Sequence, residues 1–150
     1  MGAISALLPA LLACVIAQSL KIFTHWQEEK KCELKKAFSS GGMPSSHSAT
    51  VMCLTGYIGL DQGLTSESFA ISLIFSLIVM YDATGVRLQA GRQAQVLNTI
   101  ITDLPLTHPV HDCKIVLRDS IGHTPLQVVA GAALGLLVAG FSHLIAVGLH

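Results

Sequence analysis

Charged residues are scarce in this chain, and their scarcity excludes several classes of protein. Only 12% of the 150 residues are Asp, Glu, Lys or Arg, against about a quarter in ordinary soluble domains. The hydrophobic fraction is 51% and the mean hydropathy is +0.61. We therefore expect one small membrane domain over residues 1–150. Nine basic residues balance nine acidic ones, so no net positive charge indicates a nucleic-acid partner.

Metal-ligating and redox patterns are also lacking. The four cysteines show no CxxC spacing, and we interpret them as reduced packing residues. The fragment His108-x-x-His111-Asp112 has no further ligand at a suitable spacing, so we predict no metal site and no cofactor. No Lys or Arg precedes the first apolar run, which argues against a secretory signal. Residues 3–23 are therefore predicted to remain as a membrane helix.

Four apolar runs are present, at residues 3–23, 49–60, 69–81 and 128–149. A full crossing needs roughly 20 residues, so the second and third runs would tilt, thin the bilayer or form a helical hairpin within it. Residues 81–101 carry apolar side chains at helical spacing, namely Val86, Ala90, Ala94, Leu97 and Ile101. The sequence thus predicts an all-α, polytopic membrane bundle of about four membrane helices plus one amphipathic helix.

The basic residues give the predicted bundle an orientation. With four crossings, all nine Lys and Arg residues fall on the same side of the membrane. The positive-inside rule makes that side cytoplasmic and leaves both termini outside. In the last apolar run, Gly131-x-x-x-Gly135 favours close helix packing. The sequence leaves open whether the partner helix belongs to the same chain or to a homo-oligomer.

The polar residues of greatest interest lie at the starts of two predicted helices on this cationic side. Residues 41–51 read GGMPSSHSATV and include His47, while residues 122–127 read GHTPLQ and include His123. Ser45 or Ser46 can cap the first helix, and Thr124 with Pro125 is a typical start for the second. Helix N-termini present unpaired N–H groups and partial positive charge, which suit phosphate and keep histidine neutral.

These two motifs resemble those of a known enzyme superfamily. GGMPSSHSATV and LRDSIGHTPLQVVAGAALG, at residues 117–135, are similar to the second and third motifs of the type 2 phosphatidic acid phosphatase and vanadium haloperoxidase superfamily. With MYDATGVRLQAGRQAQVLN between them, they resemble its divergent branch, the acid phosphatase/vanadium-dependent haloperoxidase-related proteins. The likeness covers about residues 3–140.

The resemblance implies roles for particular residues. His47 would be the general acid of a PSGH-like motif, in which Ser45 and Ser46 bind phosphate and Ser46 replaces a glycine. His123 would be the nucleophile of the SRxxxxxHxxxD motif. Arg118 would bind phosphate, although it lies one residue closer to the histidine than the motif requires. The lysine of the first motif, KxxxxxxRP, has Lys21 as its best candidate.

One departure concerns the aspartate that orients the nucleophile, because Gln127 stands at its position. Glutamine can accept a bond from imidazole but cannot neutralise imidazolium. Asp82 is a candidate substitute, and the alternative is an interfacial acid paired with Arg87. Arg87 and Arg92 lie about 140° apart around a helix, so one can face a phosphate and the other anionic lipid.

Two functions compete at this stage. The leading hypothesis is a membrane phosphohydrolase that acts on a phosphomonoester or diphosphate, with lipid-linked phosphates among the candidate substrates. The second is a non-catalytic membrane scaffold that binds an anion or lipid, which Gln127 and the missing first motif favour. A vanadium haloperoxidase fits poorly, because those enzymes are soluble and hold vanadate with more cations.

Overall fold

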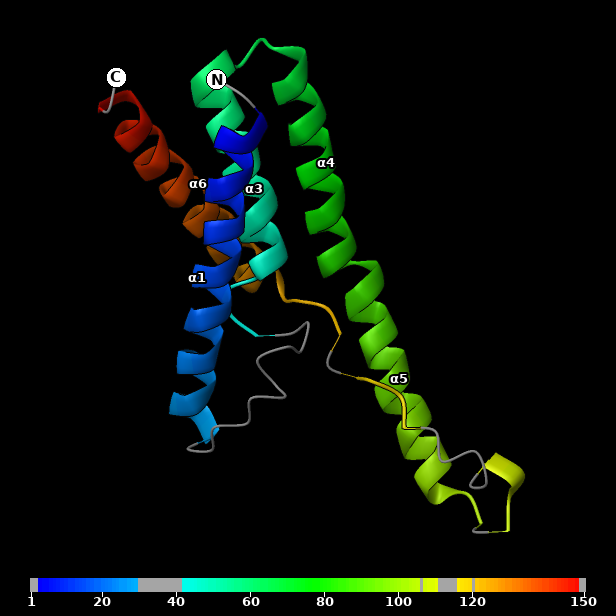
Figure 1. Ribbon diagram of the computed structural model, residues 1–150. Coiled ribbons are helices and arrows are strands. Elements are labelled where there is room, and N and C mark those ends of the chain that lie inside the picture. The colour runs from blue at the N-terminus through cyan, green and yellow to red at the C-terminus, as the bar shows by residue number, and fades with distance from the viewer. Residues whose placement is uncertain (1–2, 30–41, 106, 111–115, 120, 149–150) are drawn as a thin grey trace.

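The computed structural model describes residues 3–29, 42–105, 107–110, 116–119 and 121–148, and over residues 25–29 it describes the backbone alone. Within these ranges the chain is helical and has no strand (Figure 1). The helices are α1 (Ala3–Glu29), α3 (Ser46–Gln62), α4 (Glu67–Thr84), α5 (Val86–Asp103) and α6 (Pro125–Gly148). The predicted all-α membrane bundle is therefore confirmed.

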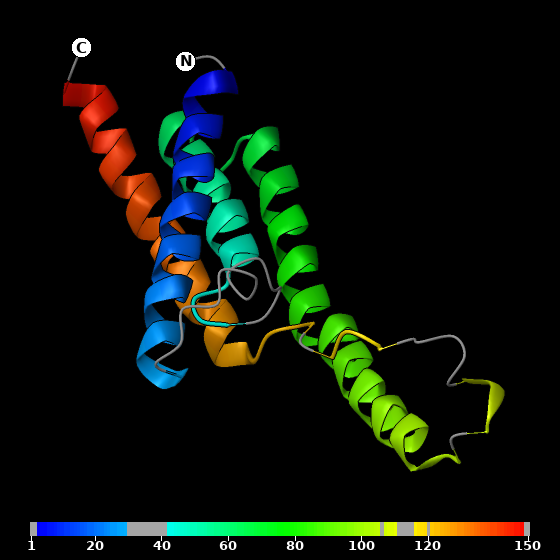
Figure 2. The ribbon, with the colours of Figure 1, turned by 60° about the horizontal axis from the view of Figure 1, so that its bottom comes forward.

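Four of the helices form a bundle that α5 leaves at one end. α1 and α4 run in one direction and α3 and α6 in the other, so the described ends of the chain and the α3–α4 turn lie at one end (Figures 1 and 2). The starts of α3 and α6 lie toward the opposite end. α5 continues the line of α4 and projects beyond the bundle there. Consequently, both histidine motifs are on the side from which α5 emerges.

The helices differ in their ability to cross a bilayer. Three segments of the described chain are long and apolar enough, Ile4–Thr24, Glu67–Asp103 and Pro125–Gly148. Helix α3 has 17 residues and a length of about 26 Å, which is shorter than a hydrocarbon core of about 30 Å. It is packed among α1, α4 and α6. The second apolar run is thus short, as the sequence indicates. The burial of α3 among the other helices compensates for its short length.

Small residues allow the helices to approach closely. Ala13 and Ala17 of α1, Ala49 and Cys53 of α3 and Ala139 of α6 belong to one fully buried cluster. Large apolar side chains instead cover the outer surfaces of α1, α4 and α6, as expected of surfaces that face lipid.

The Gly131-x-x-x-Gly135 motif packs α6 against α3 of the same chain. A Cβ atom added at Gly131 would lie 2.3 Å from the carbonyl oxygen of Ser45, and one added at Gly135 would lie 2.3 Å from that of Ala49. No side chain fits at either position, so the backbones of the two helices touch. The sequence left open whether this motif packs on a helix of the same chain or of a second copy, and the structure shows a helix pair within the chain.

The amphipathic helix is present, but it begins later than the start of the apolar spacing at residue 81. Residues 81–84 belong to α4, which ends where the Gly85 N–H donates to the Tyr81 carbonyl at 2.8 Å. The buried positions of α5 are Gly91 and Ala94. Val86 and Leu97, two of the apolar residues at helical spacing, are exposed. The backbone of Asp119 and Ile121 approaches α5 so closely at Gly91 that only a small residue fits there.

Candidate functional site

The start of α3 confirms one of the two predicted caps. Ser45 is the N-cap, and its Oγ accepts hydrogen bonds from the Ser48 N–H at 3.3 Å and the Ser48 hydroxyl at 3.0 Å. Ser46 is the first helical residue and is buried. The first N–H groups of a helix lack partners within it, so Ser46 and His47 present their backbone donors at this end of the bundle. Gly42 precedes the cap with φ +95°, a value that favours glycine.

The start of α6 is closed by a reciprocal pair of hydrogen bonds. The Thr124 N–H donates to Gln127 Oε1 at 2.9 Å, and the Gln127 N–H approaches Thr124 Oγ1 at 3.5 Å. This is a capping box, the pattern in which Thr and a Gln three residues later satisfy each other's backbone. The side-chain oxygen of Gln127 therefore bonds to the backbone of Thr124. Gln127 caps α6, and the expected orienting bond to His123 is not among the interactions of the described residues.

Backbone hydrogen bonds join the two histidine motifs to each other and to α4. The Ser45 N–H donates to the Gln127 carbonyl at 3.0 Å, and the His123 N–H donates to the Ala83 carbonyl at 3.0 Å. As a result, the His47 and His123 rings lie with their centroids 6.5 Å apart, edge to face at 75°. Two helix starts that are far apart in the sequence thus present their histidines to one space.

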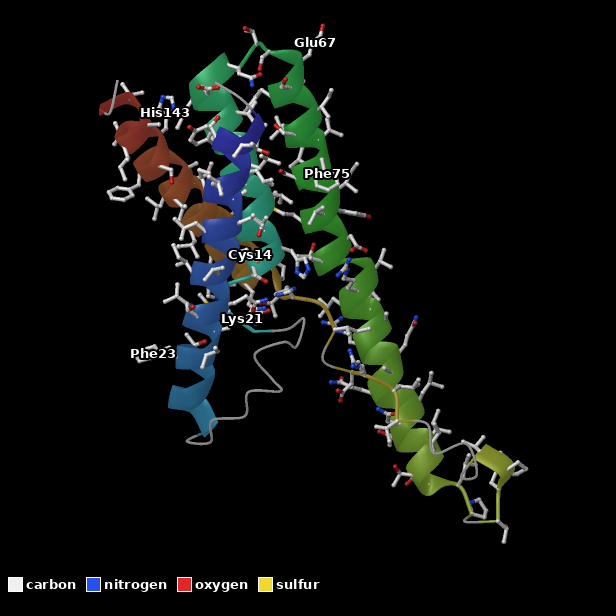
Figure 3. All side chains as sticks on the ribbon, in the orientation of Figure 1. Cys14, Lys21, Phe23, Glu67, Phe75 and His143 are labelled. Carbon is white, nitrogen blue, oxygen red and sulfur yellow. The ribbon has the colours of Figure 1, made fainter. Side chains whose placement is uncertain are left out.

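Lys21 reaches the same region from α1. Its side chain is only 4% exposed, and its aliphatic carbons pass Gly42, where an added Cβ would meet them at 3.6 Å. The Thr24 hydroxyl, one turn later, contacts the Met43 carbonyl at 3.0 Å and fixes the preceding loop to α1. Figure 3 shows Lys21 on the part of α1 beside the start of α3. Among the described residues, the buried Lys21 Nζ has no hydrogen-bond partner.

His123 is the most buried titratable group of the site. Its side chain is 2% exposed, and within the described ranges Nε2 has no hydrogen-bond partner. Burial lowers the pKa of His123 to about 4, and the charges of Lys21, His47 and Arg87 lower it further in the same direction. The imidazole is therefore neutral at pH 7. An unpaired buried polar group is costly, and here two of them, Lys21 Nζ and His123 Nε2, share one region.

Arg87 and Asp82 form an ion pair at the junction of α4 and α5. Arg87 Nε contacts Asp82 Oδ2, and both side chains are partly exposed. This is the interfacial pairing that the sequence left as the alternative for Asp82. Arg87 nevertheless lies close enough to His123 to lower its pKa. Because an exposed ion pair contributes little, Arg87 can exchange Asp82 for a bound anion at small cost.

Arg118 and His108 have no interaction with these groups in the described part of the chain. Arg118 is exposed in segment 116–119, and no interaction joins it to either histidine within the described chain. Its phosphate-binding role stays a prediction. His108 accepts the Val110 N–H at 3.3 Å, whereas His111 and Asp112 lie outside the described residues. The described part of the chain holds no group of three or more metal-ligating side chains.

Comparison with known proteins agrees with the motifs. The model of a family described as "Divergent PAP2 family" matches residues 3–138. The uncharacterized membrane protein YuiD of Bacillus subtilis (strain 168) is 38% identical over 143 residues, which cover 88% of this chain and 89% of that protein. No solved structure matches the chain. The family match spans nearly the whole bundle, both histidine motifs and the cationic end of α1, and the chain therefore belongs to the divergent PAP2 family.

Proposed function

We propose that this chain is a membrane phosphohydrolase that acts through His123 on a phosphomonoester or diphosphate. One observation carries the proposal, namely that Lys21 Nζ and His123 Nε2 are buried and have no hydrogen-bond partner in the part of the chain that the structure describes. Phosphate oxygens would pair with the lysine and with the backbone donors at the start of α3. Arg87 would add a third contact after leaving Asp82, whereas Arg118, which is exposed beside the fixed Leu117, would stay outside the site.

The chemistry follows from the placement of the two histidines. Neutral His123 attacks phosphorus, so an N–P bond forms while the bond from phosphorus to the leaving oxygen breaks. Burial lowers the pKa of His47 in the free protein, and a bound phosphate beside it would favour its protonated form, which gives its proton to that oxygen. Water then attacks the phosphohistidine and passes a proton to His47, which releases inorganic phosphate and restores neutral His123. Lys21 and the N–H groups hold the charge that develops on the phosphoryl oxygens.

An apolar hollow supports a lipid-linked substrate. A cavity of about 480 Å³ lies between α3, α4 and α6 within the bundle. Gly56 and Gly59 of α3 form part of its wall, with Phe69 and Leu73 from α4 and Leu136 from α6. The same three helices carry the site, so a phosphate held by His123 would leave a hydrocarbon chain free to extend along α3 into this hollow. We propose that the site faces the cytoplasm, following the positive-inside rule.

The second candidate, an anion- or lipid-binding scaffold without catalysis, is favoured by Gln127. Its oxygen bonds to Thr124, and Asp82 pairs with Arg87. Consequently no carboxylate contacts His123 among the described residues. Loss of the equivalent aspartate lowers turnover by about 10⁴ in a serine protease triad. Such a loss would leave phosphate binding intact while making hydrolysis slow.

The test is phosphate release by the purified protein from a panel of lipid phosphates, lipid diphosphates and soluble phosphomonoesters. We expect turnover of at least one lipid phosphate, its abolition by His123→Ala and its reduction by His47→Ala of about 10²–10⁴. His108→Ala, an exposed histidine outside the site, is the matched control and should behave as wild type. Binding of orthophosphate or vanadate without turnover on any substrate would establish the scaffold instead.

A further inference from the structure

The segment that carries His123 is fixed to α5 through hydrogen bonds and close backbone contacts. The Asn98 side chain donates from Nδ2 to the Leu117 carbonyl at 2.9 Å and accepts at Oδ1 from the Leu117 N–H at 3.0 Å. One amide thus pairs with both backbone groups of one residue, as a neighbouring strand would. The two bonds therefore hold the backbone of Leu117 beside Asn98.

Two glycines continue the contact toward the site. A Cβ added at Gly91 would lie 2.6 Å from the Ile121 carbonyl oxygen and 2.7 Å from that of Asp119. At the other end, a Cβ added at Gly122 would lie 2.5 Å from the Leu88 nitrogen. Gly122 also has φ +107°, where other residues are strained. The chain therefore lies directly on the helix backbone at both places.

The lengths of helix and segment agree. Leu88 and Asn98 are ten residues apart, which is about 15 Å along a helix. Leu117 and Gly122 are five residues apart and span at most about 17 Å when extended. The segment runs back along α5 toward the bundle (Figures 1 and 2). Leu117, Asp119, Ile121 and Gly122 are thus all held against α5, and a slip of one residue at Asn98 would displace His123 by about 3.3 Å.

From this arrangement we infer that Asn98 is a positioning residue for His123, and that α5 with Gly91 sets the register that brings His123 opposite His47. The same register leaves Arg118, the residue after Leu117, exposed. Arg87, in the first turn of α5 beside Gly122, comes to the site in its place. An effect of Asn98 on the rate of phosphate release rests on the proposed function, whereas its effect on the placement of His123 does not.

The test compares Asn98→Leu and Gly91→Ala with Gln93→Leu. The first removes both bonds to Leu117 with little change in size, and the second inserts a methyl group between α5 and the segment. Gln93 is an exposed residue of the same helix on the face away from the segment, so Gln93→Leu is the matched control. We expect kcat for phosphate release to fall about 100-fold in the first two variants, as for a misplacement of about 1 Å, with KM little changed.

A second measurement does not need turnover. In protein with ¹³C-labelled histidine, the His123 ring should titrate near pH 4 in the wild type and in Gln93→Leu. In the other two variants its pKa should rise toward 6.5, because the displaced ring is less buried. Folded variants in which kcat and the His123 titration both match wild type would overturn the inference, as would a loss of thermal stability alone. If wild type shows no turnover, the proposed function fails, and the titration still decides the role of Asn98.

Discussion

At the scale of single residues, the site is defined by buried polar groups that have no partner among the residues described. Lys21 Nζ and His123 Nε2 are both in this state, although native proteins satisfy the large majority of buried polar atoms. The two groups are complementary to a phosphate, because an ammonium donates to phosphoryl oxygens and a neutral imidazole can attack phosphorus. Their burial therefore has a chemical explanation that packing alone does not give.

Burial of neutral His123 predicts how stability depends on pH. With a folded-state pKa of about 4 against about 6.5 in the unfolded chain, the unfolded state binds more protons between these values. Stability should therefore fall as the pH falls from about 6.5 to 4, by at most about 3 kcal/mol from this residue. Thermal unfolding in detergent should show this loss of stability at low pH, and the loss should be smaller in His123→Gln. An unchanged pH profile in His123→Gln would contradict the assignment.

Gln127 gives a second prediction at this scale. Because its side chain caps α6, Gln127→Ala should destabilise the protein by about 1 kcal/mol, and Gln127→Glu should retain most of the stability by preserving the capping box. Gln127→Ala should leave the His123 titration unchanged, whereas the carboxylate of Gln127→Glu should raise the pKa of His123, because a nearby negative charge favours the imidazolium. Unfolding midpoints and the histidine spectrum measure the two effects separately. A His123 pKa that moves in Gln127→Ala with no loss of stability would instead indicate the orienting bond expected from the motif.

At the scale of helices, the site exists because α3 and α6 begin side by side. The bond from the Ser45 N–H to the Gln127 carbonyl and the contact of Gly131 with Ser45 hold the two N-termini together. Each contributes partial positive charge, so their proximity strengthens the field that favours an anion and disfavours imidazolium. Helix α4 completes the site through the Ala83 carbonyl.

The α3–α6 contact can be tested with one pair of variants. Gly131→Leu places side-chain atoms where the Ser45 carbonyl lies, and we expect destabilisation of about 3 kcal/mol or more together with loss of orthophosphate binding. Gly140→Leu lies on the same helix, and a Cβ there meets nothing within 4 Å, so it should be tolerated. Unfolding in detergent and phosphate binding are the measurements. Equal tolerance of both substitutions would show that α6 does not pack on α3 in this way.

At the scale of the whole molecule, positive charge is concentrated at one end of the bundle. The described cations Arg87 and Arg92 on α5, Arg118 after it and Lys21 near the end of the α1 span all lie toward the end opposite the termini. The site therefore lies where the membrane-spanning segments meet the cationic side. A phosphate would enter there from water or from the headgroup region, while the apolar hollow opens among the helices.

The proposed orientation can be measured by cysteine labelling. Single cysteines near residues 35 and 115, in a cysteine-free background, should react only with a reagent that reaches the cytoplasmic side. A cysteine near residue 64, in the α3–α4 connection, should react only from the opposite side. This expectation follows from the positive-inside rule and from a bundle in which α3 and α4 form a hairpin across the membrane. Labelling of residues 35 and 115 from different sides would exclude this topology.

The sequence by itself determined the properties that depend on neighbouring residues. The apolar runs place the membrane helices, and the Ser45 and Thr124 caps place the starts of α3 and α6, because capping acts within one turn. His47 and His123 were found from their positions beside these caps. The orientation prediction also depends on the sequence alone, since it counts charges between apolar runs.

Only the tertiary structure decided which groups meet. It pairs Gly131 with Ser45, holds Leu117 beside Asn98 and brings Arg87 rather than Arg118 toward His123. These contacts join segments far apart in the chain and leave no local pattern in the sequence. The bond between Gln127 and Thr124 is different, because the spacing Thr-x-x-Gln is a local signature of a capping box, and the sequence could have indicated it.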